Sequence, residues 1–216
     1  MAKAASHKFG QMIGDLLEDA MLEYMKPIAI KHNLYLDFKH SRQARNGKKE
    51  VIWIDSLDNK HKLDLVLEKN GDENKYGNPV AFIEIAWRRY KKHSKNKAQE
   101  IQGALLPLVR KYSRHSPFYG AILAGEFTNP SIQQLESEGF KVVYFSYETI
   151  IQAFKLIGIE VYWSEDTSDD EVLEKIKQYE KLSIERKNII IDSLIKSNKD
   201  QLKNFIIKLG RVRKPI

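Results

Sequence analysis

Apolar residues recur at spacings of three and four between residues 6 and 33, which is the period of one helix face. Pro27 is expected to kink or end this helix. Residues 40–49 are polar and basic, with a turn signal at Asn46-Gly47. They are predicted to form a loop that is mobile unless it is bound.

Three strand-like segments follow, at residues 51–55, 62–68 and 79–87, separated by polar, turn-rich stretches. Their order predicts an antiparallel meander. Residues 95–112 carry apolar positions at helical spacing, with Gly103 and Pro107 as weak points, and should form a helix that packs on the sheet.

The second half of the chain alternates between the two periodicities. The pattern predicts a strand at 119–124, a helix at 129–138, a strand at 141–145 and a helix at 147–156, and this order implies a parallel crossover. A short strand at 159–163 and two amphipathic helices at 169–182 and 184–209 complete the chain. We therefore expect an α/β fold with a mixed central sheet flanked by helices. Residues 1–163 would form the core and 164–216 a helical annex of the same domain.

Composition and charge narrow the function classes. Cysteine is absent, so disulfides and thiolate zinc sites are excluded. Neither a membrane-length apolar run nor a signal-peptide pattern occurs, which predicts a soluble, unprocessed protein of the cytoplasm. The net charge of +7 favours a polyanionic partner such as nucleic acid. Phosphate-loop, dinucleotide-binding, serine-esterase and His-Glu-x-x-His motifs are all missing.

Two carboxylates stand inside apolar strand segments. Asp64 lies between Leu63 and Leu65, and Glu84 lies 20 positions later between Ile83 and Ile85. An unpaired buried charge costs several kcal/mol, so a compensating group is expected. Two converging carboxylates would suit Mg²⁺, which prefers oxygen ligands. In the simpler alternative, both acids face solvent or pair with basic neighbours such as Arg88 and Lys62.

A basic run follows Glu84 directly. Residues 87–97 hold six Lys or Arg and no acid, which predicts a phosphate-binding surface beside the metal site, although most charge runs form a solvated face. Trp87 and Tyr90 in this run would pack on DNA or in the core. The basic loop, through Arg42 and Arg45, is expected to contribute to base readout. The DNA-binding residues predicted in the basic run are Arg88, Arg89, Lys91, Lys92 and Lys95.

From residue 6 to residue 145, the chain resembles the PD-(D/E)xK nuclease superfamily, and within it the type II restriction endonucleases. Asp64 matches the first acid of the motif and Glu84 the second. The resemblance implies that both bind Mg²⁺, with the main-chain carbonyl of Ile85 as a further ligand. It also implies cleavage of double-stranded DNA that leaves a 5′ phosphate. A restriction enzyme would act as a homodimer and have a companion DNA methyltransferase in the same cell.

The sequence departs from this motif at one position. The motif's lysine should stand two residues after Glu84, where this chain has Ala86. Lys97 is our choice to replace it, and the other candidates are Lys95, Lys92 and Lys62. Glu18 resembles an extra acid that some members use, although a plain surface acid on the helix is the favoured interpretation. A repair, junction-resolving or excision nuclease of the same fold and a non-catalytic DNA-binding protein remain the alternatives.

Overall fold

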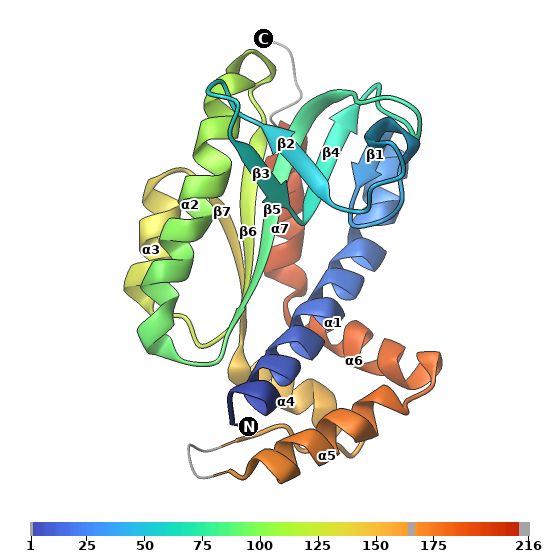
Figure 1. Ribbon diagram of the computed structural model, residues 1–216, viewed down its shortest axis with the longest axis vertical. Helices are drawn as coiled ribbons and strands as arrows, with labels where there is room; N and C mark the ends of the chain where they lie inside the picture. Colours follow the sequence, from blue (N-terminus) through green and yellow to red (C-terminus); the bar gives the residue numbers. More distant parts are fainter. Residues whose placement is uncertain (1, 164–166, 212–216) are drawn as a thin grey trace.

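A five-stranded mixed sheet forms the centre of the computed structural model, which describes residues 2–163 and 167–211 (Figure 1). Its strands, in spatial order, are β1 (Leu34–Asp37), β4 (Leu65–Lys69), β5 (Asn78–Arg88), β6 (Phe118–Gly125) and β7 (Lys141–Ser146). β4 is antiparallel to both of its neighbours, whereas β5, β6 and β7 are parallel. The predicted α/β fold and the parallel crossover are confirmed. Edge strand β1 was not predicted.

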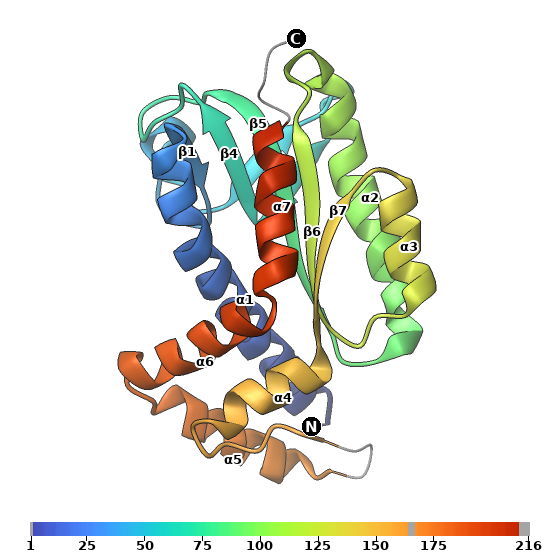
Figure 2. The same ribbon diagram turned by 180° about the vertical axis from the view of Figure 1, so that it is seen from behind.

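Helices cover both faces of the sheet, and each face has its own hydrophobic core (Figures 1 and 2). One core is completed by α1 (Ala2–Lys31), α4 (Tyr147–Lys155), α5 (Asp169–Glu180), α6 (Ile184–Ser197) and α7 (Lys199–Arg211). The other is completed by α2 (Ser94–Lys111), α3 (Asn129–Ser137) and a hairpin of β2 (Val51–Ile54) and β3 (Lys60–Leu63). Short 3-10 turns are η1 (Gln43–Arg45), η2 (Lys91–His93) and η3 (Ser113–His115).

Hydroxyl side chains define where four of these helices begin. Each accepts a hydrogen bond from the main-chain N–H three residues later, which satisfies a donor that the first helical turn leaves free. The caps of α3, α4, α5 and α6 are Thr128, Ser146, Ser168 and Ser183.

The segment predicted as one strand at 62–68 is broken at Asp64. Residues 63, 65 and 67 of a continuous strand would share one face. Instead Leu63 packs in the core under α2, while Leu65 and Leu67 pack in the core under α1. β3 pairs with β2 in a separate two-stranded sheet, and β4 pairs with β1 and β5. The chain therefore changes sheets at Asp64, and the single meander that we expected is wrong.

Three further expectations need correction. Pro27 does not end α1, because the helix continues to Lys31. Residues 159–163 form no strand. The last predicted helix is divided at Asn198 into α6 and α7, where the Asn198 side chain donates to the Tyr144 carbonyl at 2.7 Å.

Helices α5, α6 and α7 contribute to the same core as α1 and the sheet. Within the described residues, the helices after residue 163 therefore have no hydrophobic core of their own. No helix in the described part of the chain is long and apolar enough to cross a membrane.

Arg42 and Arg45 do not lie on the surface, so the prediction that they contact DNA is wrong. The Arg42 guanidinium is fully buried, pairs with Glu68 at 2.6 Å and with Asp37 at 2.9 Å, and lies 4.2 Å from the centre of the Tyr35 ring. Arg45 donates to both carboxylate oxygens of Asp37. These contacts anchor the loop from within, because the strand carboxylates at its base require buried cations.

Replacing Arg42 with Met should strongly destabilise the protein. Glu68 and Asp37 would lose a buried cation, and removing one partner of a buried ion pair costs about 3–5 kcal/mol. Equilibrium unfolding in urea measures this loss. Lys48→Met, an exposed change in the same loop, should alter the unfolding free energy by less than about 0.5 kcal/mol. Equal effects of the two variants would contradict a structural role for Arg42.

Candidate active site

Asp64 occupies the bend between β3 and β4, beside the part of β5 that continues past β4. Its Oδ2 atom accepts a hydrogen bond of 2.7 Å from the main-chain N–H of Ile85. The last registered pair between β4 and β5 is Leu65 with Ile83, so no β4 residue is in register with Ile85. The N–H and C=O of one strand residue point to the same side. The Ile85 carbonyl therefore faces the side on which Asp64 lies.

Glu84 is the most deeply buried acid of the site, with 8% exposure. It lies on the same face of β5 as Phe82 and Ala86, which face the core under α2. Its Oε1 atom is buried and has no hydrogen-bond partner. Burial and the adjacent negative charge of Asp64 raise the pKa of Glu84 well above its ordinary value of 4.5. The side chain is therefore held where its charged form is poorly compensated.

Two more acidic positions complete this negative centre. Burial raises the pKa of Asp64, although the Ile85 N–H and Lys97 oppose the rise. Glu18, on α1, has a pKa raised to about 7 by burial and then by the charge of Asp64. Glu18, Asp64 and Lys39 line a hollow of about 340 Å³. The structure thus places Glu18 beside Asp64. A plain surface acid would not have a pKa raised in this way.

Lys97 is the cation with the largest influence on the pKa values of both Asp64 and Glu84. Its position follows from the packing of α2 on β5. Ala86 and Ala98 are both buried in the core between these elements, and their small side chains allow close approach. Lys97 precedes Ala98 in the first turns of α2, so the helix holds its charge near both carboxylates. Lys95 and Lys92 are exposed, and Lys62 pairs with Glu50 at 2.8 Å.

The donor set suits a hard divalent cation such as Mg²⁺. Among the described residues, no group of three or more His, Cys, Asp or Glu side chains is arranged to hold a metal. The available oxygen donors are instead two carboxylates, Asp64 and Glu84, with the Ile85 carbonyl on the same side. The unpartnered Oε1 of Glu84 fits a ligand, because a buried carboxylate oxygen otherwise needs a donor. Carboxylates and main-chain carbonyls are oxygen ligands of the kind Mg²⁺ takes.

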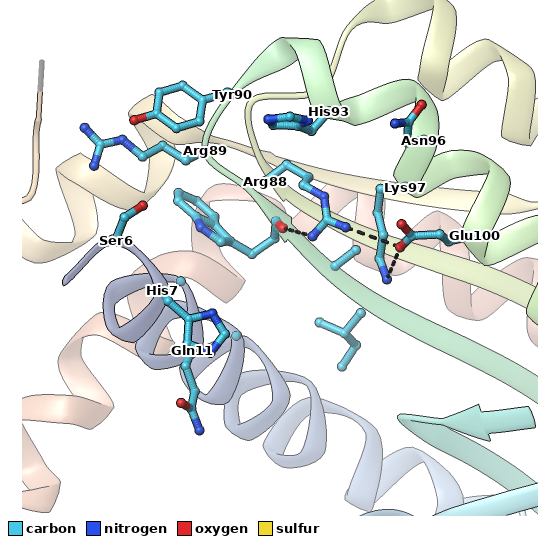
Figure 3. A pocket seen from close by; sticks show the side chains of 15 residues that line it. Ser6, His7, Gln11, Arg88, Arg89, Tyr90, His93, Asn96, Lys97 and Glu100 are labelled. Atoms are coloured by element: carbon cyan, nitrogen blue, oxygen red, sulfur yellow. Dashed lines mark hydrogen bonds and ion pairs between the residues drawn. The ribbon is translucent and has the colours of Figure 1, made fainter. Parts of the chain in front are cut away.

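The basic run borders a pocket of about 1020 Å³ between the start of α1 and the junction of β5 with α2 (Figure 3). Arg88, Arg89 and Lys97 line it. Glu100 accepts from Arg88 and pairs with Lys97, each at 3.3 Å. Lys91 lies outside this lining and pairs with Glu126 at 3.5 Å. The run therefore combines cations that acids partly neutralise with exposed ones such as Lys95.

The aromatic residues of the run have separate roles. Trp87 packs edge-to-face against Phe9 and Tyr147, with ring centres 5.9 and 5.5 Å away. It thus serves the core that α1 and α4 form. Tyr90 lines the pocket, and Arg89 and Lys92 lie over its ring.

Sequence reasoning missed three residues that border the site. Lys39 follows β1, and only the pairing of β1 with β4 brings it to Asp64. His7 and Gln11 line the large pocket from α1. Their spacing of four places them on one helix face, but no local signal indicates that this face meets the basic run.

No protein family model matches the chain, and no curated protein matches it. One solved structure, the crystal structure of a protein of unknown function designated AF1548, is similar over 89% of this chain and 98% of its own. The two share 14% sequence identity, with a TM-score of 0.37. A likeness at this level says nothing of function.

The raised pKa values predict that the metal-free protein loses stability as pH rises. Glu18, with a pKa of about 7, and Glu84 keep protons in the folded state that the unfolded chain has already released. Their contribution to stability is complete below the unfolded value of 4.5 and is lost as pH rises through the folded pKa values. In EDTA, the melting temperature should therefore fall between about pH 5 and pH 8.

The variant Glu84→Gln isolates the contribution of the site from other pH effects. The amide cannot ionise, so the fall in melting temperature should become shallower. Glu136→Gln, an exposed change on α3, should keep the wild-type slope. A Glu84→Gln slope as steep as that of the wild type would show that Glu84 titrates normally.

Proposed function

We propose that the protein is a Mg²⁺-dependent endonuclease that hydrolyses phosphodiester bonds in double-stranded DNA. The observation that carries this proposal is the pair of desolvated carboxylates, Asp64 and Glu84, beside Ile85, which lines a pocket together with Arg88 and Lys97. Negative charge that is poorly compensated within the protein needs a cation, and the neighbouring Arg88 and Lys97 suit phosphates. Phosphodiester hydrolysis uses both kinds of site side by side.

Each residue receives a role from its surroundings. Asp64, Glu84 and the Ile85 carbonyl would hold Mg²⁺, which when bound adds positive charge at the phosphate and lowers the pKa of an attacking water. The Ile85 N–H fixes the orientation of the Asp64 carboxylate. Lys97 would orient the water, in place of the motif's lysine, whose position in this chain holds Ala86. Water would add to phosphorus as the bond to the 3′ oxygen breaks, which leaves a 5′ phosphate and a 3′ hydroxyl.

Phosphate contacts are assigned to Arg88, Arg89, Lys91, Lys92 and Lys95. All lie between the end of β5 and the start of α2, on one side of the pocket or next to it. Phosphate contacts position a duplex but carry no sequence information directly. With Arg42 and Arg45 buried, the exposed residues of the same loop, such as Lys48 and Lys49, are the ones available to approach DNA.

The resemblance to type II restriction endonucleases extends this proposal to sequence-specific cleavage. Cutting both strands at a palindromic site requires two active sites related by a two-fold axis, so the enzyme would act as a homodimer. A companion DNA methyltransferase would protect the host sites. Repair or junction-resolving nucleases of the same fold would use the same residues on DNA of a different shape.

Incubating the protein with unmethylated plasmid, in Mg²⁺ or in EDTA, tests the activity. Discrete fragments that require Mg²⁺ and disappear in both Asp64→Asn and Glu84→Gln are expected, because each variant removes a metal-binding charge. Intact plasmid that the wild-type protein binds in Mg²⁺ would instead identify a non-catalytic DNA-binding protein, the alternative that Ala86 favours.

Exchanging single lysines tests which one replaces the motif lysine. Lys97→Met should lower the cleavage rate about 10²–10⁴-fold, the usual contribution of a group that assists proton transfer. Lys95→Met is the matched control on the same helical turn, and its exposed side chain predicts a change of less than about tenfold, limited to phosphate binding. Single-turnover cleavage at saturating DNA measures both rates. Equal losses in the two variants would remove Lys97 from the catalytic role.

A further inference from the structure

The pocket beside the candidate active site has two walls, and only one of them belongs to the basic run. Arg88, Tyr90 and Lys97 form one wall, and His7 and Gln11 on α1 stand across from them (Figure 3). The His7 and Gln11 side chains are exposed. Glu100, the acid in the lining, is engaged with Arg88 and Lys97. The pocket therefore offers positive charge from the wall of the basic run and hydrogen-bond donors from both walls.

A stripe of α1 connects this pocket to the carboxylates. Ser6, Gly10, Gly14 and Glu18 are spaced by four residues, so they follow one another along one face of the helix. Ser6, Gly10 and Gly14 line the large pocket, and Glu18 lines the hollow beside Asp64. The two cavities thus lie one after the other along α1.

The glycines on this stripe need an explanation, because glycine weakens the interior of a helix. Packing explains Gly10 only in part, since a methyl group there would stand 3.5 Å from the Trp87 ring, an ordinary contact. Packing does not explain Gly14 at all, because a methyl group there would meet no atom within 4 Å. The space in front of Gly14 is open, and the stripe ends at Glu18, beside the centre where the buried Glu84 Oε1 lacks a partner.

We infer that this stripe is the second wall of a nucleic-acid cleft, and that the sugar–phosphate backbone of the strand to be cut passes close to α1 at Gly14. This inference rests on the proposed function and adds substrate-contacting positions to it. Absence of a side chain at Gly14 lets the strand reach from the large pocket to the carboxylates. His7 and Gln11 contact the same strand from the side opposite Arg88 and Lys97.

The size and charge of the pocket fit this occupant. Pockets for small molecules measure about 300–1,000 Å³; this one measures about 1020 Å³, and the hollow at Glu18 lies about one helical turn beyond Gly14 along α1. A chain-like ligand can occupy two cavities on successive turns of one helix, whereas a compact ligand fills only one of them. Cations on one wall and neutral donors on the other match a phosphodiester backbone, which presents acceptors along its length.

Gly14→Leu tests the inference by placing a side chain in the open space. The leucine side chain would clash with a strand that passes at Gly14, and the free-energy cost of such a clash should weaken DNA binding about 5- to 100-fold. The dissociation constant for a fluorescein-labelled 20-base-pair duplex, measured by anisotropy at low salt in EDTA, reports this without any cleavage. The melting temperature should stay level or rise, since leucine is the better helix former.

Gly210→Leu is the matched control. Gly210 also lies in a helix, α7, with nothing within 4 Å of an added methyl group. Phe205 of α7 packs against Phe118 at the start of β6, whereas the pocket lies where β5 ends. The control should therefore bind DNA as the wild type does. Gln11→Glu provides a second variant should Gly14→Leu fail to fold, and its added negative charge on an exposed site should also weaken binding.

The outcomes separate this inference from the proposed function. Weaker binding by Gly14→Leu or Gln11→Glu, with normal binding by Gly210→Leu, supports a strand path along α1. Wild-type affinity in both cleft variants overturns the path, while Mg²⁺-dependent cleavage by the wild type would leave the nuclease proposal standing. Failure of the wild-type protein to bind the duplex and to cut plasmid overturns both.

Discussion

Negative charge that the protein itself does not neutralise is the constraint around which the candidate site is arranged. Glu84 is buried on the central strand, and Asp64 is fixed beside it by the Ile85 N–H at 2.7 Å. Burial raises the free energy of both charged forms, and the charge of Asp64 adds to this at Glu84, so both pKa values rise. Lys97 opposes the rise for both but leaves Glu84 well above its ordinary value. The resulting arrangement favours either protons or a bound cation.

Elsewhere the same protein compensates buried charge completely. Arg42 and Arg45 reach into the fold and pair with Glu68 and Asp37. The contrast is informative, because this fold can supply buried cations to strand carboxylates where structure requires them. At Glu84 it leaves an oxygen atom without a partner instead. A buried carboxylate without a partner destabilises the folded protein, and such strongly shifted groups are concentrated at functional sites.

Much of the fold was predictable because its elements carry strong periodicities. The helices α1, α2, α3 and α4 and the strands β5, β6 and β7 appear near their predicted positions. The bend at Asp64 was not predictable, because Leu63, Leu65 and Leu67 alternate as in one strand, and only the two cores show that they face different ways. Division of the last helix at Asn198 likewise depends on a tertiary contact with Tyr144.

The candidate site was predictable to a similar degree. Asp64 and Glu84 were identified from acids placed within apolar strands. Arg42 and Arg45 were misassigned, because a basic loop and a loop with buried arginines have the same composition. Lys97 was one of several candidates until the packing of Ala86 against α2 placed it by the carboxylates. The wall formed by α1 depends on contacts between elements far apart in sequence, which local patterns do not encode.

The central claim is that Asp64 and Glu84 form a cation site, and calorimetric titration of Mg²⁺ into the protein tests it most directly. At about pH 6.5, in two buffers with different ionisation enthalpies, the account predicts saturable binding with net release of protons, since carboxyl groups with raised pKa values must ionise to bind a metal. The signal should disappear in Asp64→Asn. Absence of Mg²⁺ binding to the wild-type protein, or equal binding by the variant, would contradict the account.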